Sequence, residues 1–277
     1  MNQKENRIYS VLMSVYRKEK PDHLRLAMES MLRQTVPPEE FILICDGPLT
    51  AELDAVIEEM AAKAPCLRVI RLEKNQGLGH ALRLGMESCS CELVARMDSD
   101  DISLPDRCEK ELTYLAAHPE ISVVGGWIGE FSASPDQIQS IRQVPENADE
   151  ILAFAKKRNP FNHPSVMLRK RDVLAAGNYQ EVRYLQDYYL WAAMLAKGYQ
   201  GHNLQEILVH MRADENLFKR RSGREYIRIQ TNLFKWMREK GMITRREYWT
   251  SCAIRTLSGF APNGLRQLVF KRVLRKT

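Results

Sequence analysis

The first hundred residues of the chain alternate between short apolar runs and longer segments with helical periodicity. The apolar runs cover 8–15, 41–45, 67–72 and 93–97, and the helical segments cover 21–33, 50–62 and 77–88. Strands that alternate with helices in this way pair in parallel, with helices on both faces of the sheet. The pattern therefore predicts an α/β fold with a mostly parallel sheet. Because such sheets bind ligands at the carboxyl ends of their strands, the residues that follow each run are the first candidates for a site.

Polar residues follow three of the four predicted strands. The first strand ends in Ser14-Val15-Tyr16, Asp46 follows the second, and the fourth runs into Asp98-Ser99-Asp100-Asp101, which we call the acidic turn. Since the carboxyl ends of parallel strands share one edge of the sheet, we expect these groups at one rim. Acidic side chains there would repel a bare phosphate. They predict either a divalent cation or a ligand with hydroxyl and N–H groups.

The acidic turn is the sharpest chemical signal in the sequence. Three carboxylates within four residues repel one another unless they share a positive charge. Asp98 and Asp100 alternate along an extended turn and can point to one side, where they would hold Mg²⁺ or Mn²⁺. A solvated turn that leads into the helix after Pro105 is the alternative. The position at the end of an apolar strand favours the metal site.

The second half of the chain keeps the mixed pattern and then becomes wholly helical. Helices are predicted from Pro105 to about 118, at 148–157 and at 187–196, strands at 121–128 and 208–212, and a polar loop or lid at 132–143. Beyond Ser222 the predicted helices cover 224–240, 245–256 and 264–275. We therefore expect an α/β domain at 1–215 and a helical C-terminal extension at 216–277.

The charge of the chain is unevenly distributed. From Arg212 onward there are 17 lysines and arginines against 5 acidic residues, whereas the preceding 211 residues carry 24 against 30. A basic extension favours contact with anions. Its amphipathic pattern, with Trp236 and Trp249 among the cations, fits a membrane surface, and a solvated basic face packed on the first domain is the alternative. Nucleic acid is not an expected partner, because the densest basic run is confined to residues 219–221 and no known nucleic-acid-binding motif accompanies it.

Targeting signals and metal-binding cysteine patterns are not found in the sequence. No apolar run approaches the roughly 18 residues that a membrane span needs, and the first residues lack the apolar core of a signal peptide. The six cysteines include no C-x-x-C pair and no zinc-finger spacing, so we expect free thiols. Both observations predict a cytoplasmic protein.

Four motifs together resemble the family 2 glycosyltransferases, which are inverting enzymes of the Rossmann-like GT-A fold. The motifs are Ser14-Val15-Tyr16 with Glu19, Asp46-Gly47, Asn75-Gln76-Gly77-Leu78-Gly79 before Ala81-Leu82 and Gly85, and Ala95-Arg96-Met97 followed by the acidic turn. The resemblance covers about 8–212. It is closest to the bacterial enzymes that build capsules, exopolysaccharides and O-antigens.

The resemblance implies a role for each matched residue. The segment Val15-Tyr16, with Glu19, would line the nucleotide pocket, and Asp46 would accept a hydrogen bond from an N–H of the base, most often uracil. Asp98 would contact the ribose or share the metal. Asp100 would be the main ligand of Mn²⁺ or Mg²⁺, which offsets the charge on the departing nucleoside diphosphate.

The resemblance also implies the substrates. A sugar would pass from a nucleotide sugar, most often UDP-linked, to a glycan or a lipid-linked acceptor. Because a lipid-linked acceptor lies in the membrane, the protein would work at the inner face of the cytoplasmic membrane, where its basic C-terminal helices would make contact.

An inverting transfer needs a base for the acceptor hydroxyl. Members of the family use the Asp of a Glu-Asp pair at the start of a helix, followed by an aromatic residue and Leu-Trp. The match is Gln186-Asp187-Tyr188-Tyr189-Leu190-Trp191, so Asp187 is the predicted base, and Gln186 departs from the usual Glu. An N-cap of its own helix is the structural alternative for Asp187.

Three further matches have two interpretations each. His163, in Asn-His-Pro-Ser, would line the pocket or be a satisfied structural histidine. Arg212 would face the diphosphate or be a surface arginine. The segment from Asn75 to Gly79, with Gly77 at its centre, is similar to a phosphate loop, but it follows the third strand and lacks a third glycine, which favours close packing of helix and sheet beside the nucleotide.

Two other functions share the same predicted features. A sugar nucleotidyltransferase would have the same sheet and metal, but it usually carries a glycine-rich loop after the first strand, and residues 15–19 contain no glycine. A nucleotide-binding protein without transferase activity would be expected to lose Asp100 or Asp187, and both are present.

Overall fold

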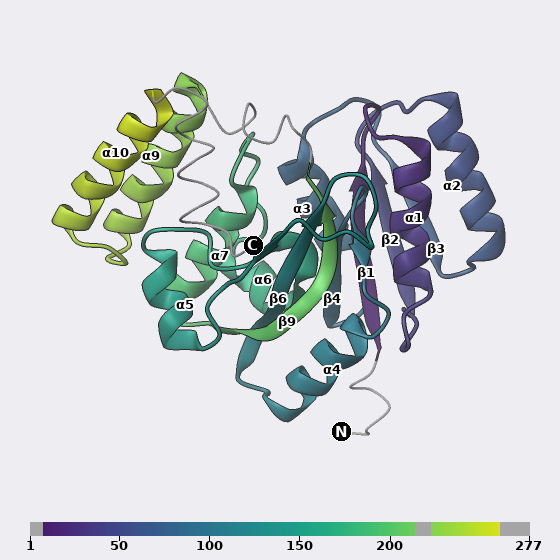
Figure 1. Ribbon diagram of the computed structural model, residues 1–277, viewed down its shortest axis with the longest axis horizontal. Helices are drawn as coiled ribbons and strands as arrows, with labels where there is room; N and C mark the ends of the chain where they lie inside the picture. Colours follow the sequence, from purple (N-terminus) through teal and green to yellow (C-terminus); the bar gives the residue numbers. More distant parts are fainter. Residues whose placement is uncertain (1–7, 214–222, 261–277) are drawn as a thin grey trace.

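The computed structural model describes residues 8–213 and 223–260 of the 277-residue chain and confirms the predicted α/β fold (Figure 1). The first half contains β1 (Tyr9–Val15), α1 (Pro21–Leu32), β2 (Glu40–Cys45), α2 (Ala51–Lys63), β3 (Leu67–Arg71), α3 (Leu78–Ser88) and β4 (Leu93–Asp98). β1 pairs in parallel with β2 and β4, and β2 pairs in parallel with β3. These elements agree with the prediction to within one residue at each end.

The second half of the domain is mixed. Its elements are β5 (Ile102–Ser103), α4 (Arg107–Ala117), β6 (Ile121–Phe131), β7 (Ser140–Arg142), α5 (Ala148–Ala155), the short 3₁₀ helix η2 (His163–Ser165), β8 (Met167–Arg169), α6 (Lys170–Ala176), α7 (Gln186–Ala196) and β9 (Gln200–Arg212). The strand order is β3-β2-β1-β4-β8-β6-β9-β5, and β7 pairs with β6. The antiparallel pairings, which include both pairings of β8, span only two or three residues each, so the sheet is mostly parallel.

The two long strands of this half exceed the prediction. β9 begins at Gln200 rather than at 208, and β6 continues to Phe131 rather than ending at 128. Their parallel pairing shifts register on either side of Trp127, so the simple alternation of apolar and polar residues is lost there. The polar segment 132–143 was predicted to be a loop or lid. It is the connection of a hairpin, because its last residues form β7 against β6.

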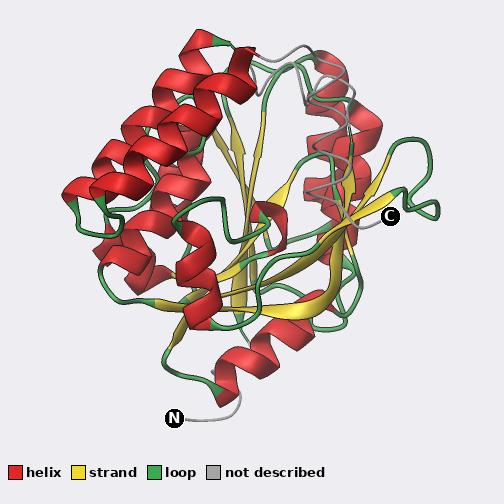
Figure 2. Ribbon diagram, turned by 60° about the vertical axis from the view of Figure 1, so that its left-hand side comes forward, coloured by secondary structure: helices red, strands yellow, loops and turns green. Residues whose placement is uncertain are grey.

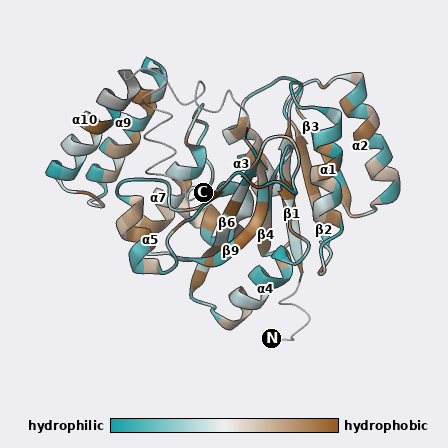
Figure 3. Ribbon diagram, viewed as in Figure 1, coloured by the Kyte–Doolittle hydropathy of each residue, from teal (hydrophilic) through white to brown (hydrophobic). Residues whose placement is uncertain are grey.

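Helices lie on both faces of the sheet (Figure 2). Successive strand residues point to opposite faces and build two apolar cores. Val11 and Met13 of β1 pack with α1, α2 and α4, whereas Leu12 between them packs with α3, α6 and α7 on the other face. Because helices cover both faces, the central strands are apolar along most of their length, as their brown colour in Figure 3 shows.

The residues Thr50 and Gly77 determine where α2 and α3 begin. The loops before these helices lie at the carboxyl edge of the sheet. Thr50 Oγ1 accepts the backbone N–H of Leu53 at 3.3 Å and so forms the N-cap of α2. α3 follows Gly77, whose φ of 91° is a conformation that other residues rarely adopt. Within α3, a Cβ on Gly85 would lie 2.2 Å from Leu12 Cδ1. Gly85 therefore permits close packing of α3 on the sheet, whereas this role was predicted for the glycines at 77 and 79: a Cβ on Gly77 would meet nothing within 4 Å, and one on Gly79 would meet the backbone of Gln180.

The described part of the C-terminal extension, 223–260, forms a helical hairpin of α9 (Arg224–Glu239) and α10 (Arg245–Phe260), at the left of Figure 1. Leu233 and Phe234 of α9 pack with Tyr188 of α7 in a third apolar cluster. The described part of the extension therefore packs on α7, and contact of its other face with a membrane stays a prediction.

Several predictions concern segments outside the described residues or general features of the chain. The predicted helix at 264–275 and the basic run 219–221 lie outside the described residues. All six cysteines are free thiols, which confirms the prediction from their spacing. Among the described helices, none has both the length and the apolar content that crossing a membrane requires.

Candidate active site

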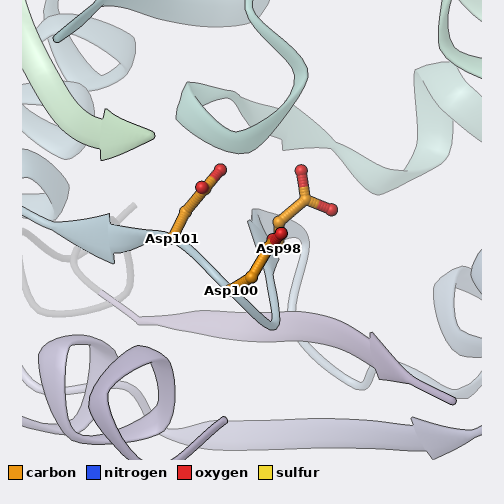
Figure 4. A group of neighbouring side chains, drawn as sticks. All are labelled: Asp98, Asp100 and Asp101. Carbon is orange, nitrogen blue, oxygen red and sulfur yellow. The ribbon is translucent and has the colours of Figure 1, made fainter. Parts of the chain in front are cut away.

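The acidic turn follows β4 at the carboxyl edge of the sheet, and its three carboxylates point into one space (Figure 4). One oxygen atom of each of Asp98, Asp100 and Asp101 lies within 4.8 Å of the others. The two predicted metal ligands are therefore joined by a third carboxylate. Carboxylate oxygens are the ligands that hard divalent cations prefer, so this donor set fits Mg²⁺ or Mn²⁺.

Burial and like charges raise the pKa values of Asp100 and Asp101. Burial raises the pKa of Asp100 to about 7, and the carboxylates of Asp98 and Glu19 contribute to the rise. Burial also raises the pKa of Asp101 well above its usual value, with further contributions from Asp100 and Asp98. A cation at this position would stabilise the ionised form of both acids.

Arg96 is a buried cation beside the turn. It lies in β4 two residues before Asp98, is only 1% exposed, and forms an ion pair with Asp98 Oδ1. The pair leaves Asp98 Oδ2 available to a metal or a ribose hydroxyl. No role was predicted for Arg96, although a charge inside an otherwise apolar strand is a visible signal.

The residues predicted to line the nucleotide pocket from the first strand lie at the same edge of the sheet. Val15 is buried, whereas Tyr16 is 40% exposed at the end of β1. Glu19 Oε2 accepts a hydrogen bond from Ser99 Oγ at 2.8 Å, so the loop after β1 holds the acidic turn directly. Contact of these residues with a nucleotide stays a prediction.

Asp46 holds the loop that precedes α3. Its Oδ1 accepts the N–H of Gln76 at 2.7 Å, and its Oδ2 accepts the N–H of Gly77 at 3.0 Å and Nδ2 of Asn75 at 2.9 Å. The loop after β2 contacts the loop before α3 closely at Gly47, where a Cβ would lie 2.5 Å from the Asn75 backbone nitrogen. The structure thus brings the predicted residues Asp46, Asn75 and Gly77 together, and binding of the base by Asp46 stays a prediction.

Arg212 reaches the acidic turn from β9. Its backbone N–H donates to Asp101 Oδ1 at 2.8 Å, and its Nε donates to the carbonyl of Asp100 at 3.3 Å. Its guanidinium lies 4.7 Å from the centroid of the Phe131 ring. Arg212 therefore belongs to the site rather than to a remote surface, while its contact with a diphosphate stays a prediction.

His163 is a buried, neutral residue beside the site. Its Nε2 lies 3.0 Å from Tyr179 Oη. Burial and the nearby charge of Arg96 hold its pKa well below the usual value. These contacts fit the interpretation of His163 as a satisfied structural histidine, and a role in lining the pocket stays a prediction.

Asp187 lies in the first turn of α7. The helix begins at Gln186, and its N-cap position is Leu185 with a φ of 62°, so the interpretation of Asp187 as an N-cap is wrong. Asp187 Oδ2 accepts a hydrogen bond from Nδ2 of Asn159 at 2.5 Å. Asn159 was not singled out by the sequence, because a loop asparagine gives no chemical signal by itself.

Tyr179 relates Asp187 to the acidic turn. It is fully buried, and burial is the main reason that its pKa is raised. The charge of Arg96 opposes this rise, whereas the carboxylates of Asp187 and Asp98 both add to it. Both carboxylates therefore act electrostatically on the same phenol, and the meeting of the predicted base and the predicted metal ligands in one site stays a prediction.

The sequence of the chain matches a known protein family. The family described as Glycosyl transferase family 2 matches residues 10–177, more than half of the chain. The chain belongs to glycosyl transferase family 2. It is therefore a glycosyltransferase, as its motifs predicted.

Two similar proteins match this glycosyltransferase along almost its whole length. The amylovoran biosynthesis glycosyltransferase AmsE of Erwinia amylovora is 37% identical over 268 residues, which are 96% of this chain and 98% of AmsE. The UDP-Gal:alpha-D-GlcNAc-diphosphoundecaprenol beta-1,3-galactosyltransferase of Escherichia coli is 34% identical over 272 residues, which are 97% of each chain.

Solved structures show that this glycosyltransferase has the GT-A fold. S. aureus TarS 1–349 in complex with UDP superposes with a TM-score of 0.64 at 16% identity, over 96% of this chain and 75% of TarS 1–349. The mannosyltransferase PcManGT from Pyrobaculum calidifontis, solved with GDP-Man and Mn²⁺, gives a TM-score of 0.59 at 12% identity, over 95% of this chain and 78% of PcManGT.

Proposed function

We propose that this glycosyltransferase moves a sugar from a UDP-linked donor to a glycan or lipid-linked acceptor in one displacement that inverts the anomeric carbon. The observation that carries the proposal is the convergence of the three carboxylates of the acidic turn after β4. The E. coli relative is named for UDP-Gal and a diphosphoundecaprenol acceptor, and TarS was solved with UDP, which supports this choice of substrates. The name of AmsE supports a place in bacterial surface polysaccharide synthesis.

The acidic turn is proposed to hold the divalent cation of the reaction. Asp98 and Asp100 would be the ligands of Mn²⁺ or Mg²⁺, and the Mn²⁺ complex of PcManGT supports this assignment. Such a cation, when bound, neutralises charge on a departing nucleoside diphosphate. Arg212, which is anchored on the same turn, would donate hydrogen bonds to the diphosphate.

The nucleotide is proposed to lie over the ends of β1 and β2. The segment Val15-Tyr16 would contact it from one side and the loop from Asn75 to Gly77 from the other. Asp46 already binds this loop through both carboxylate oxygens, so it would present one remaining lone pair to an N–H of the base. A neutral His163 would border the sugar side of the pocket.

Asp187 is proposed to be the base of the reaction. It would take the proton from the acceptor hydroxyl while that oxygen forms a bond to the sugar carbon, and the bond between that carbon and the diphosphate would break on the opposite face. Gln186, beside it in the first turn of α7, is buried and uncharged. Asp187 would therefore act without the neighbouring acid that the family usually provides.

The test is sugar transfer by the purified protein with Mn²⁺, a panel of UDP-sugars and a lipid-linked acceptor. We expect Asp100→Ala and Asp187→Asn each to lower the transfer rate by about 100-fold or more. Asp149→Asn, an exposed acid at the start of α5, is the matched control and should keep the wild-type rate. Undiminished transfer in both site variants would contradict the assignment.

The C-terminal extension, 216–277, is proposed to hold the catalytic domain, 1–215, at the inner face of the cytoplasmic membrane. α10 exposes Arg245 and Arg246 together with Trp249 and Ile254, which are 66% and 58% exposed. Cations next to exposed aromatic and aliphatic side chains suit the headgroup layer of an anionic bilayer.

Sedimentation with lipid vesicles tests this contact. The full chain should sediment with vesicles that contain phosphatidylglycerol and should stay in solution with vesicles of phosphatidylcholine alone. Trp249→Ser should weaken sedimentation without changing sugar transfer to a water-soluble acceptor. Equal sedimentation with both kinds of vesicle, or with neither, would contradict the proposal.

A further inference from the structure

Asn159 lies in the loop between α5 and η2, next to the proposed base. Its Nδ2 donates to Asp187 Oδ2 at 2.5 Å, and its Oδ1 accepts the backbone N–H of Phe161 at 3.3 Å. The opposite orientation of the amide would place an oxygen against the carboxylate and an NH₂ group against an N–H. The two neighbours therefore allow only one orientation of the Asn159 side chain.

The backbone around Asn159 is fixed to the sheet. Arg142 in β7 donates from Nη2 to the carbonyl of Asn159 at 3.3 Å. Three residues after Asn159, the fully buried Asn162 donates from Nδ2 to the carbonyl of Gly126 at 2.8 Å and to that of Arg142 at 3.2 Å. The loop is thus held by both strands of the β6–β7 hairpin.

The helix that carries Asp187 is tied to the same region. Tyr188, the next residue of α7, donates its hydroxyl to the carbonyl of Ala155 at 2.5 Å. Ala155 is the last residue of α5, four positions before Asn159. The backbone segments that carry Asn159 and Asp187 are therefore both held in place by hydrogen bonds to neighbouring elements.

We propose that Asn159 is a positioning residue for Asp187. Asn159 donates a hydrogen bond to Oδ2 of Asp187. Among the described residues, no donor forms a hydrogen bond with Oδ1 of Asp187. Asn159 therefore sets the plane of the carboxylate and leaves Oδ1 to receive the proton of the acceptor hydroxyl. A base is effective only within hydrogen-bond reach of that proton, so its orientation enters the rate directly. This inference rests on the proposed function, in which Asp187 is the base.

The first test measures Asn159→Ala with the wild-type donor and acceptor. The kcat for transfer should fall by about 10- to 100-fold, as when an orienting hydrogen bond of a reactive group is removed. The KM for the donor and the affinity for UDP with Mn²⁺ should not change, because Asn159 contacts the base and not the acidic turn. Asn147→Ala, which removes the N-cap asparagine of α5, is the matched control and should keep the wild-type kcat.

The second test combines two substitutions. If Asn159 acts through Asp187, then adding Asn159→Ala to Asp187→Asn should lower the residual transfer rate no further. A merely structural role would lower the rate by the same factor in both backgrounds and would overturn the inference. Thermal unfolding of each variant checks that it is folded, and Asn159→Ser replaces Asn159→Ala if the latter does not fold.

The outcomes separate this inference from the proposed function. A wild-type kcat in Asn159→Ala, with Asp187→Asn inactive, overturns the positioning role and leaves Asp187 as the base. Full activity of Asp187→Asn overturns the proposed base and the positioning role with it. A lower kcat in Asn159→Ala with unchanged UDP affinity, and no further loss in the double variant, supports both.

Discussion

At the scale of single residues, the acidic turn holds the carboxylates of the site whose ionised form is least favourable. Asp100 and Asp101 are held near Asp98 and Glu19, and their pKa values are raised because burial and like charges both disfavour the ionised form. Arg96 offsets only part of this charge, since its ion pair is with Asp98. The folded protein therefore carries an electrostatic repulsion that the proposed cation would relieve.

This repulsion predicts how the stability of the metal-free protein depends on pH. The folded pKa of Asp100, about 7, lies above that of an unfolded aspartate, so the folded state binds the proton more tightly. The stabilisation from that proton is complete below the unfolded pKa and is lost as pH rises through about 7. The melting temperature of the wild type should therefore fall, relative to Asp100→Asn, between pH 5 and pH 8 in the presence of a chelator. Parallel curves for the two proteins would contradict this.

Gly47 allows a second prediction at this scale. Its φ is 87°, and a Cβ there would lie 2.5 Å from the Asn75 backbone, whereas Gly198 has a φ of 84° with no atom within 4 Å of such a Cβ. Gly198→Ala should cost about 1 kcal/mol from backbone strain alone, and Gly47→Ala about 2 to 3 kcal/mol, because it adds a clash. Urea unfolding measures both. Equal losses would show that the two loops can move apart freely.

From the sequence, candidate residues of the site could be proposed, but not their contacts. Asp98, Asp100 and Asp187 are candidates because carboxylates at a strand end or a helix start belong to a recognisable motif, and their roles stay predictions. The support from Asn159 was not found, because its hydrogen bond joins residues 28 positions apart. The attachment of Asp46 to the glycine loop was not predicted either, since only the folded chain shows that these two loops meet.

At the scale of elements, the parallel half of the sheet was predictable because each strand and helix is long and periodic. β5 and β8 have only two and three residues, which is too short for any period to be visible. β8 nevertheless joins the two halves of the sheet, since it pairs with β4 on one side and with β6 on the other. The sequence therefore predicted the helix and sheet layers, but not the antiparallel strand β8 that connects the two halves of the sheet.

The docking of α9 on α7 gives a prediction at this scale. Phe234 of α9 is 1% exposed and packs against Tyr188, one residue after Asp187. Phe234→Ala should lower the free energy of unfolding by about 3 kcal/mol, and it should also lower kcat, since the helix that carries the base loses a neighbour. Ile254→Ala, on the exposed face of α10, should change neither quantity by more than about 0.5 kcal/mol or twofold. Unfolding in urea and transfer assays check both.

At the scale of the whole molecule, the site lies where the two halves of the sheet meet. The parallel half supplies the acidic turn and the loops around Asp46, and the mixed half supplies Arg212 and α7 with Asp187. The C-terminal helices pack behind α7 rather than over the sheet edge (Figure 1). The acidic turn and Asp187 therefore lie on different halves of one sheet and its helices.

The most direct test of the account is the anomeric configuration of the product, determined by NMR after transfer from an α-linked UDP-sugar. A single displacement with Asp187 as the base predicts a β-linked product from the wild type. An α-linked product would contradict the account, because retention requires a different mechanism from one attack on the face opposite the leaving diphosphate.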